Sequence, residues 1–237
     1  MPGVITVPLF SRGVSGVDHY FGTKTESEPA SRMGGPAMRV VTLNQVHGSE
    51  VLVIDRRSST RFSAGHDAVV TNQQGLLLTV RSADCVPILL LDTARPVVAA
   101  VHAGWRGTLR GIVTETLGVM HTRFGCSLGT IRAAIGPSIG VCCYEVGQTV
   151  LTPLKRAYPY WRDVVEQVGG VQAHLDLHRL NGRQLEEAGI DPARIETVSL
   201  CTACHPELFY SYRRDGRGTR HMTSGIGLSP SRRVGVQ

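Results

Sequence analysis

Short apolar runs separated by turn residues constrain the fold of this chain more than any other feature of its sequence. From Arg39 onward, runs of four to six residues rich in valine, isoleucine, leucine and alanine recur between segments that contain glycine, proline, asparagine or aspartate. Runs of this length and composition are typical of buried strands. We therefore predict strands over residues 51–54, 68–71, 76–80, 87–91, 97–101, 130–135 and 197–200.

Segments with helical periodicity lie between some of these runs. Residues 108–123 place apolar side chains three and four positions apart, which indicates an amphipathic helix. We also predict helices over residues 147–157 and 175–188, the second of which has Gly189 as a suitable C-terminal cap. Because some strands follow each other directly and others alternate with helices, the pattern favours an α/β fold with mixed β-sheets. We predict a single domain that spans residues 1–237.

The composition excludes disorder and a membrane span. The chain is 42% hydrophobic, with its apolar residues spread along the whole length, and no apolar run reaches the ~18 residues that a transmembrane helix needs. The first residues carry neither a basic segment nor a long apolar core, so we expect a cytoplasmic protein. Residues 24–38 are polar and rich in glycine and proline, which predicts a loop.

The net charge of +6 comes almost entirely from arginine, because only Lys24 and Lys155 are lysines. Arginine offers a planar fork that suits phosphate and carboxylate groups. The basic residues are scattered and form no lysine-rich stripe, so we expect a small anionic ligand and neither nucleic acid nor a membrane as partner. No coiled-coil seam is visible, and we expect a monomer or a weak homodimer.

The six cysteines are expected to be reduced, as in a cytoplasmic enzyme. Cys201 and Cys204 form a CxxC motif that is followed by His205, a pattern that also occurs at haem attachment sites. A structural zinc site would need a second ligand pair at similar spacing, and the adjacent Cys142 and Cys143 do not have it. We therefore favour free thiols over disulfides, haem or a structural zinc ion.

Cys85 and His102 are the first candidates for chemistry. Cys85 begins one predicted strand region and His102 directly follows another, so pairing of these strands would bring the two side chains to one sheet edge. A thiol paired with an imidazole becomes a thiolate, which is either a nucleophile or a metal ligand. His47 would complete a His-Cys-His set with an open fourth position, which suits catalytic zinc.

Arginines near two predicted turns are candidates for binding an anion. Arg106 lies where a predicted strand runs through a glycine-rich turn into a helix, whose free N–H groups also favour an anion. The neighbouring Trp105 is either a stacking platform for a base or a core residue. Arg213 and Arg214 would form a two-arginine anion site or lie in a solvated charged loop.

Six segments of the sequence occur together, in order and at consistent spacing. They are NQVHGSEV at 44–51, DAVVT at 67–71, SADCVP at 82–87, VHAGWRGT at 101–108, IGPSIGVCCYEVG at 135–147 and CTACHPELFYSYRRDG at 201–216. Together they resemble the YfiH family, whose members are also called laccase-domain or polyphenol oxidase proteins and multifunctional purine nucleoside phosphorylases. The resemblance runs from about Arg39 to Arg220.

The resemblance implies a fold, a metal and several activities. The implied fold is a four-layer α/β/β/α sandwich with mixed β-sheets. The implied metal is zinc, held by His47, Cys85 and His102. The implied reactions are phosphorolysis of adenosine, inosine and methylthioadenosine, and hydrolytic deamination of adenosine, so purine nucleosides and phosphate are the expected partners. An older assignment of the family is copper-dependent phenol oxidation, and another is an amidase that acts on cell-wall precursors.

Three hypotheses therefore stand. In the first, a zinc-dependent purine nucleoside phosphorylase and adenosine deaminase, Asp84 is a candidate proton carrier beside the metal ligands. The residues expected to bind substrate or phosphate are Asn44, Arg81, Arg106, Arg213 and Arg214. In the second, a hydrolase, Cys85 is the nucleophile and His102 the base. The third, a copper-dependent phenol oxidase, is disfavoured because the nine histidines include no His-x-His pair.

Overall fold

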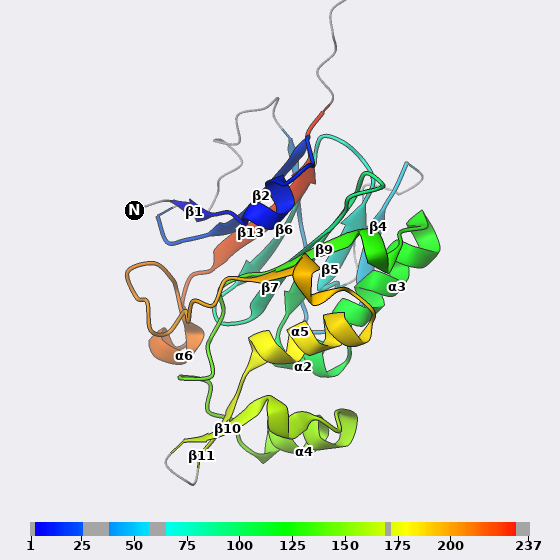
Figure 1. Cartoon of the computed structure of the whole chain (residues 1–237). Helices are drawn as coiled ribbons and strands as arrows, with labels where there is room; N and C mark the ends of the chain where they lie inside the picture. Colours follow the sequence, from blue (N-terminus) through cyan, green and yellow to red (C-terminus); the bar gives the residue numbers. More distant parts are fainter. Residues whose placement is uncertain (1–2, 26–37, 57–64, 169–171, 231–237) are drawn as a thin grey trace, which may run out of the picture.

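Two β-sheets stacked face to face form the centre of the molecule (Figure 1). The computed structural model describes residues 3–25, 38–56, 65–168 and 172–230, so residues 26–37 of the predicted loop at 24–38 lie outside the described residues. The larger sheet contains, in spatial order, β12 (Ile195–Thr197), β9 (Ile131–Ile135), β7 (Val86–Asp92), β8 (Val97–Ala103), β5 (Ala68–Thr71) and β4 (Val51–Ile54). The smaller contains β1 (Val4–Ile5), β2 (Val17–Gly22), β13 (Met222–Leu228), β6 (Leu76–Ser82) and β3 (Arg39–Thr42).

Both sheets are mixed. The pairs β4–β5, β9–β12 and β3–β6 are parallel, whereas the other neighbours are antiparallel. The central strands β7 and β8 are buried on both faces, which explains why their sequences are continuous apolar runs. Leu89 and Leu91 of β7 pack toward the smaller sheet, and Ile88 and Leu90 pack toward the helices.

Helices cover the outer face of the larger sheet. The helices of ten or more residues are α3 (Ile112–Phe124), α4 (Gln148–Ala157) and α5 (Leu177–Glu187), and apolar side chains of all three join one core cluster with that sheet. The single helix predicted over 108–123 is in fact two, α2 (Trp105–Leu109) and α3. The chain breaks at Gly111, whose φ of 74° is left-handed and cannot continue a right-handed helix.

The remaining elements lie at the margins of the sandwich. The hairpin of β10 (Val165–Val168) and β11 (Gln172–Leu175) lies with α4 at the lower end in Figure 1. The one-turn helix α1 (Pro8–Ser11) contacts β2 and β9, and α6 (Tyr212–Asp215) follows a long loop. Single 3₁₀ turns occupy Leu128–Thr130, Trp161–Asp163 and Pro192–Arg194.

The predicted fold class is confirmed, because the chain forms an α/β structure with mixed sheets. Of the four α/β/β/α layers that the resemblance implies, the described parts of the chain show three, namely the long helices, the larger sheet and the smaller sheet. They include no long helix on the outer face of the smaller sheet. The strand predicted over 197–200 is wrong in its bounds, because β12 ends at Thr197. None of the helices within these described ranges is long and apolar enough to cross a bilayer.

Candidate active site

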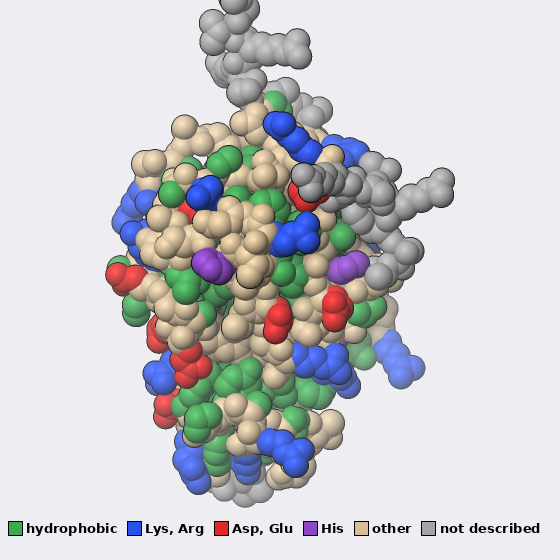
Figure 2. Space-filling model, turned by 90° about the vertical axis from the view of Figure 1, so that its right-hand side faces the viewer, with side chains coloured by type: hydrophobic (Ala, Val, Ile, Leu, Met, Phe, Trp, Pro, Cys, Tyr) green, Lys and Arg blue, Asp and Glu red, His purple; other side chains and the backbone are tan. Residues whose placement is uncertain are grey.

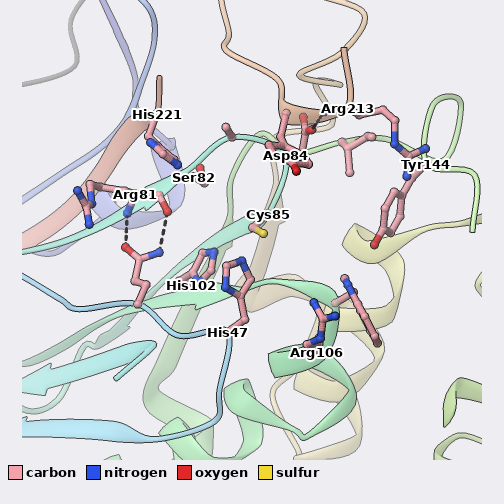
Figure 3. A pocket seen from close by; sticks show the side chains of 15 residues that line it. His47, Arg81, Ser82, Asp84, Cys85, His102, Arg106, Tyr144, Arg213 and His221 are labelled. Carbon is pink, nitrogen blue, oxygen red and sulfur yellow. Dashed lines mark hydrogen bonds between the residues drawn. The ribbon is translucent and has the colours of Figure 1, made fainter. Parts of the chain in front are cut away.

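A cavity of about 660 Å³ opens where β7 begins and β8 ends (Figure 3). Histidine, cysteine, arginine and aromatic side chains line it together, which is the mixture expected of a pocket for a polar, ring-containing ligand. Its lining residues are Gln45, His47, Arg81, Ser82, Ala83, Asp84, Cys85, His102, Trp105, Arg106, Ile139, Tyr144, Tyr212, Arg213 and His221.

The antiparallel pairing of β7 with β8 brings the central residues together. Pro87 lies opposite His102 in the register, so Cys85 emerges beside the end of β8. His47 reaches the same point from the loop before β4, and its ring meets that of His102 edge to face at 4.9 Å between centroids. The ligand atoms of His47, Cys85 and His102 all lie within 4.8 Å of one another. We call these three residues the triad.

A buried carboxylate that the sequence analysis did not single out organises the triad. Asp67, just before β5, accepts a hydrogen bond of 2.7 Å at Oδ1 from Nδ1 of His102. It also accepts the backbone N–H groups of Val46, His47 and Gly48 at 3.1, 3.0 and 2.7 Å. These bonds hold His47 in a left-handed conformation with φ of 59°, which is uncommon for a residue with a side chain. Asp67 thus fixes both histidines of the triad. In the sequence, this aspartate is the first residue of the DAVVT segment of the resemblance and directly precedes a buried strand.

Hydrogen bonds and charges within the site shift the pKa values of Cys85, His102 and Asp67. Burial by itself raises the pKa of the Cys85 thiol, but hydrogen bonds and positive charge from His102 and His47 outweigh it and lower that pKa to about 7. Burial lowers the pKa of His102, but hydrogen bonds to Asp67 and Cys85 outweigh it and raise that pKa to about 9. Desolvation also opposes ionisation of Asp67, yet the bonds from His102, Gly48 and Val46 lower its pKa overall.

The triad fits a metal ion by its donor chemistry and by its spacing. Two imidazoles and one thiolate suit zinc or copper, and Asp67 supplies the carboxylate partner that metal-binding histidines usually have. The backbone leaves room for the ligands at Gly104, where a Cβ atom would lie 3.0 Å from both Sγ of Cys85 and Cδ2 of His47. The triad is therefore a site that could bind a metal.

We expect Gly104→Ala to weaken metal binding by the triad about tenfold or more. The added methyl group must displace the Cys85 sulfur or the His47 ring, and shifts of ligand orientation carry costs of this size. Isothermal titration of the metal-free protein with zinc measures the change. Gly118→Ala is the control, because a Cβ atom in that helical position meets nothing within 4 Å. Equal zinc affinity in the Gly104→Ala and Gly118→Ala variants would contradict this geometry.

Asp84 lies at the pocket, but both of its carboxylate oxygens are engaged. Oδ1 accepts the Thr202 hydroxyl at 2.6 Å, and Oδ2 accepts the backbone N–H of Arg213 at 2.7 Å. Its backbone has φ of 91°, and its carbonyl accepts the N–H of Ile139. The residue therefore ties the loop that carries Cys85 to two other loops of the pocket wall.

Two of the predicted anion-binding arginines have side chains free for a ligand. Arg81 and Arg106 line the pocket on opposite sides of the triad, and Figure 3 shows Arg81 beside His221 and Arg106 facing Tyr144. The Arg106 guanidinium lies over the Trp105 ring at 4.3 Å from its centroid. Gln45 pairs with the backbone of Arg81 through two hydrogen bonds of 2.8 Å. These bonds do not involve the Arg81 side chain, and Arg81 lines the cavity.

Arg213 and Arg214 have the same predicted role in the sequence, but they occupy different positions in the structure. Arg213 lines the pocket and donates to the carbonyls of Cys143 and Glu145 at 3.1 and 3.0 Å. Arg214 lies outside the pocket lining and donates to Asp215 and to three backbone carbonyls, so its guanidinium is used to hold its own loop together. The structure therefore places Arg214 away from the pocket, with its guanidinium bound to protein acceptors.

The structure also places Asn44 away from the cavity. Asn44 is exposed and outside the pocket lining, whereas the next residue, Gln45, lines the pocket. Tyr144, Tyr212 and His221 also line the pocket, although no pattern in the sequence singled them out. The two tyrosines stand within the CCYE and SYRRD segments of the resemblance, which could have indicated them.

Charged side chains outside the pocket are dispersed. On the face shown in Figure 2, arginines and lysines are interspersed with acidic and apolar side chains and form no continuous basic stripe.

The chain thus combines a mixed α/β sandwich with a His-Cys-His triad that could bind a metal, in a pocket lined by arginines and tyrosines. The sequence profile of the family described as "Multi-copper polyphenol oxidoreductase laccase" matches residues 23–229, and the chain belongs to this family. The resemblance stated from the six sequence motifs is thereby confirmed.

Relatives in this family carry names of two activities. The chain is 36% identical over 205 residues to "Adenosine deaminase RL5" from an unknown prokaryotic organism, which covers 83% of this chain and 78% of that protein. It is 36% identical over 204 residues to "Purine nucleoside phosphorylase YlmD" of Geobacillus stearothermophilus, covering 81% and 73%. It is 32% identical over 191 residues to mouse "Purine nucleoside phosphorylase LACC1", covering 79% of this chain but only 43% of that longer protein. These names support an enzyme with a function like that of a purine nucleoside phosphorylase.

Solved structures share the fold. A Bacillus licheniformis protein described as hypothetical protein YfiH superposes with a TM-score of 0.86 at 28% identity, covering 97% of each chain. Neisseria meningitidis protein NMB0706 superposes with a TM-score of 0.81 at 26% identity, covering 97% of this chain and all of that one.

Proposed function

We propose that this protein is a zinc-dependent purine nucleoside phosphorylase that also deaminates adenosine. The observation that carries the proposal is the triad beside a pocket lined by both arginines and aromatic rings. The substrates we propose are adenosine, inosine and methylthioadenosine, with phosphate as the second substrate. The names of the relatives support the same activities.

The pocket contains groups that suit each part of a nucleoside. Trp105, Tyr144 and Tyr212 offer aromatic faces on which a purine can stack. Arg106 and Arg81 offer cationic forks for phosphate, because neither guanidinium hydrogen-bonds to a protein acceptor within the described ranges. The cavity of about 660 Å³ falls in the usual range for small-molecule sites.

Phosphorolysis requires the pocket to align three groups, which are the phosphate, the sugar and the purine base. A phosphate oxygen forms a bond to C1′ of the sugar, the bond between C1′ and the purine nitrogen breaks, and the base leaves with the electron pair and takes up a proton. Arg106 or Arg81 would hold the phosphate in line, which removes much of the entropic part of the barrier. Stacking on the aromatic side chains would hold the base while positive charge develops on the sugar.

His47, Cys85 and His102 would hold the zinc ion, and Asp67 would hold His102 in the required tautomer. A zinc ion with three protein ligands supplies Lewis-acid activation of a group in its open fourth position. In deamination, the elements of water add at C6 of adenine and ammonia leaves, so a pocket that activates an oxygen nucleophile serves this reaction too. The same donor set also suits copper, which the family description suggests.

Zinc is preferred to copper because the described residues lack the wider histidine array of a multicopper oxidase. Within residues 3–25, 38–56, 65–168 and 172–230, only two groups of potential ligands gather, the triad and a set of four cysteines. Neither group adds a second histidine-rich centre close to the triad. Phenol oxidation therefore has weaker support than nucleoside chemistry.

A hydrolase acting on cell-wall precursors remains the second candidate, and one observation favours it. Asp67, His102 and Cys85 follow one another as in a cysteine–histidine–acid catalytic set, with the thiol pKa lowered to about 7. In that function Cys85 would attack a carbonyl carbon as a thiolate. A metal ligand and a nucleophile cannot be the same sulfur at one moment, so metal content separates the two functions.

Incubation of zinc-loaded protein with inosine tests the proposed function. We expect hypoxanthine to accumulate only when phosphate is present, with ribose 1-phosphate formed in equal amount. With adenosine and no phosphate, we expect inosine and ammonia. Chromatography of the products measures both reactions. Fully metallated protein that yields no free base with any of the three nucleosides would overturn the phosphorylase, and cleavage of an amide in a metal-free sample would favour the hydrolase.

A further inference from the structure

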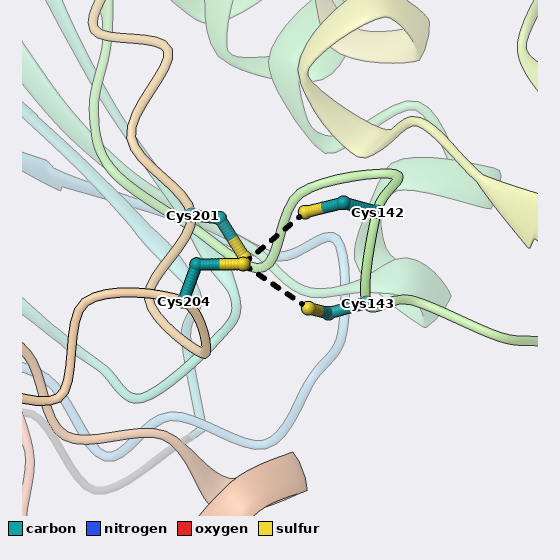
Figure 4. Close-up of side chains that lie close together, drawn as sticks. All are labelled: Cys142, Cys143, Cys201 and Cys204. Atoms are coloured by element: carbon teal, nitrogen blue, oxygen red, sulfur yellow. Dashed lines mark hydrogen bonds between the residues drawn. The ribbon is translucent and has the colours of Figure 1, made fainter.

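Four cysteines gather outside the active-site triad (Figure 4). Cys142 and Cys143 come from the loop between β9 and α4, and Cys201 and Cys204 come from the loop after β12. All four Sγ atoms lie within 4.8 Å of one another, with Cys204 at 3.6 Å from Cys142 and 3.4 Å from Cys143. The different spacings of the two pairs predict that they do not share a ligand, but the structure brings all four sulfurs together.

The spacing of the sulfurs matches a shared metal ion better than a disulfide. Zinc–sulfur bonds of about 2.3 Å in a tetrahedron place the sulfurs about 3.8 Å apart. A disulfide needs two sulfurs at about 2.05 Å and uses them in isolated pairs. Here one sulfur, that of Cys204, has two neighbours at nearly equal distance, and the cysteines converge from two loops on one point.

The backbone at Gly140 provides a hydrogen-bond donor and space for the sulfurs of the four cysteines. The N–H of Gly140 donates to Sγ of Cys201 at 3.2 Å. Gly140 also leaves space for the sulfurs, since a Cβ atom there would lie 3.3 Å from Sγ of Cys142 and 3.1 Å from Cβ of Cys201. Donors aimed at a sulfur and a gap beside it are what a thiolate metal site requires.

We propose that Cys142, Cys143, Cys201 and Cys204 bind a structural zinc ion, separate from the triad. Four protein thiolates leave no open coordination position, so this site supports structure and not catalysis. All four ligands are side chains of this protein, and the site is independent of the reaction that the triad performs.

The position of the site indicates what it stabilises. One of its loops carries Tyr144 and Ile139, and the other leads to Tyr212 and Arg213, all of which line the pocket. The two loops otherwise meet through polar contacts, such as the Thr202 N–H donating to the Ser138 carbonyl at 2.9 Å. A zinc ion held by both loops would fix this wall of the pocket, which faces the triad from the side of Arg106.

Metal content in a triad-free background tests the proposal. The Cys85→Ala variant, purified in reductant with zinc, should retain about one zinc ion per chain. Adding Cys143→Ser and Cys204→Ser should reduce this to nearly none, whereas adding Cys126→Ala, which removes a thiol outside both groups, should leave it unchanged. Equal zinc content with and without the two serine substitutions, or no zinc in the Cys85→Ala variant, would overturn the site.

Alkylation of the unmodified chain tests it without any substitution. Peptide mapping should find Cys142, Cys143, Cys201 and Cys204 protected from iodoacetamide in zinc-loaded protein and modified at least tenfold faster after chelation. Equal alkylation of the four cysteines in both samples would contradict the proposal. So would a disulfide among them in protein kept in reductant and zinc.

Discussion

Replacement of Cys85 with alanine should remove the metal of the triad and lower kcat/KM for phosphorolysis by on the order of a thousandfold. The thiolate is the only anionic ligand of the three, and it lies within 4.8 Å of both imidazole ligand atoms. Loss of several kcal/mol of electrostatic stabilisation corresponds to such a factor, since each ~1.4 kcal/mol is tenfold in rate. Steady-state rates of hypoxanthine release and metal analysis of the same samples measure both effects.

The matched control for this change is Cys126→Ala, which removes a buried cysteine that is not among the residues lining the pocket. It should lose some stability from the small cavity left behind while it retains the metal of the triad and the rate. A Cys85→Ala variant that keeps its full rate would show that the sulfur neither binds a catalytic metal nor attacks substrate. A variant that loses the rate but retains the triad's zinc would instead favour the nucleophile.

Replacement of Asp67 with asparagine should weaken metal binding by the triad about 10–100-fold and destabilise the fold by about 1–3 kcal/mol. Each carboxylate oxygen of Asp67 accepts two hydrogen bonds, Oδ1 from His47 and His102 and Oδ2 from Val46 and Gly48. An amide must turn its NH₂ group toward one of these pairs of donors, which leaves them unsatisfied in a fully buried position. Zinc titration and urea unfolding measure the two effects.

Asp92→Asn is the control that separates the loss of zinc affinity from the loss of stability. Asp92 is also a buried aspartate, but it lies outside the pocket. Only its Oδ1 accepts hydrogen bonds within the described parts of the chain, from the N–H groups of Ala94 and Arg95. Its replacement should leave zinc affinity unchanged. If Asp67→Asn and Asp92→Asn bind zinc equally, Asp67 does not position His102 for a metal.

The sequence was sufficient to predict the core strands, and the reason is physical. Strands β5, β7 and β8 are buried on both faces, so each is a continuous apolar run with turn residues on either side. Strands β2 and β13 were missed because they mix polar residues and glycine with apolar ones. Their places in the smaller sheet depend on partners far away in the chain, such as the pairing of Ser224 with both Phe21 and Val80.

The residues of the triad could be named in advance because strand ends bring Cys85 and His102 together, and because the motif around His47 resembles a known family. The sequence could not separate Arg213 from Arg214, since only the turn of α6 decides which one points into the pocket. Nor could it reveal that the Cys142–Cys143 pair meets the CxxC motif, because that contact joins loops about 60 residues apart. Contacts of this kind are properties of the fold and have no local signature.

Zinc titration of metal-free protein, with enzyme rate and bound metal followed together, tests the central claim most directly. The difference in bound zinc between the wild-type chain and the Cys85→Ala variant gives the occupancy of the triad. We predict that the rate of phosphate-dependent hypoxanthine release rises in proportion to this occupancy and stops rising when the triad is full. A rate that is already maximal without zinc, or that stays at zero when the triad is full, would contradict the claim.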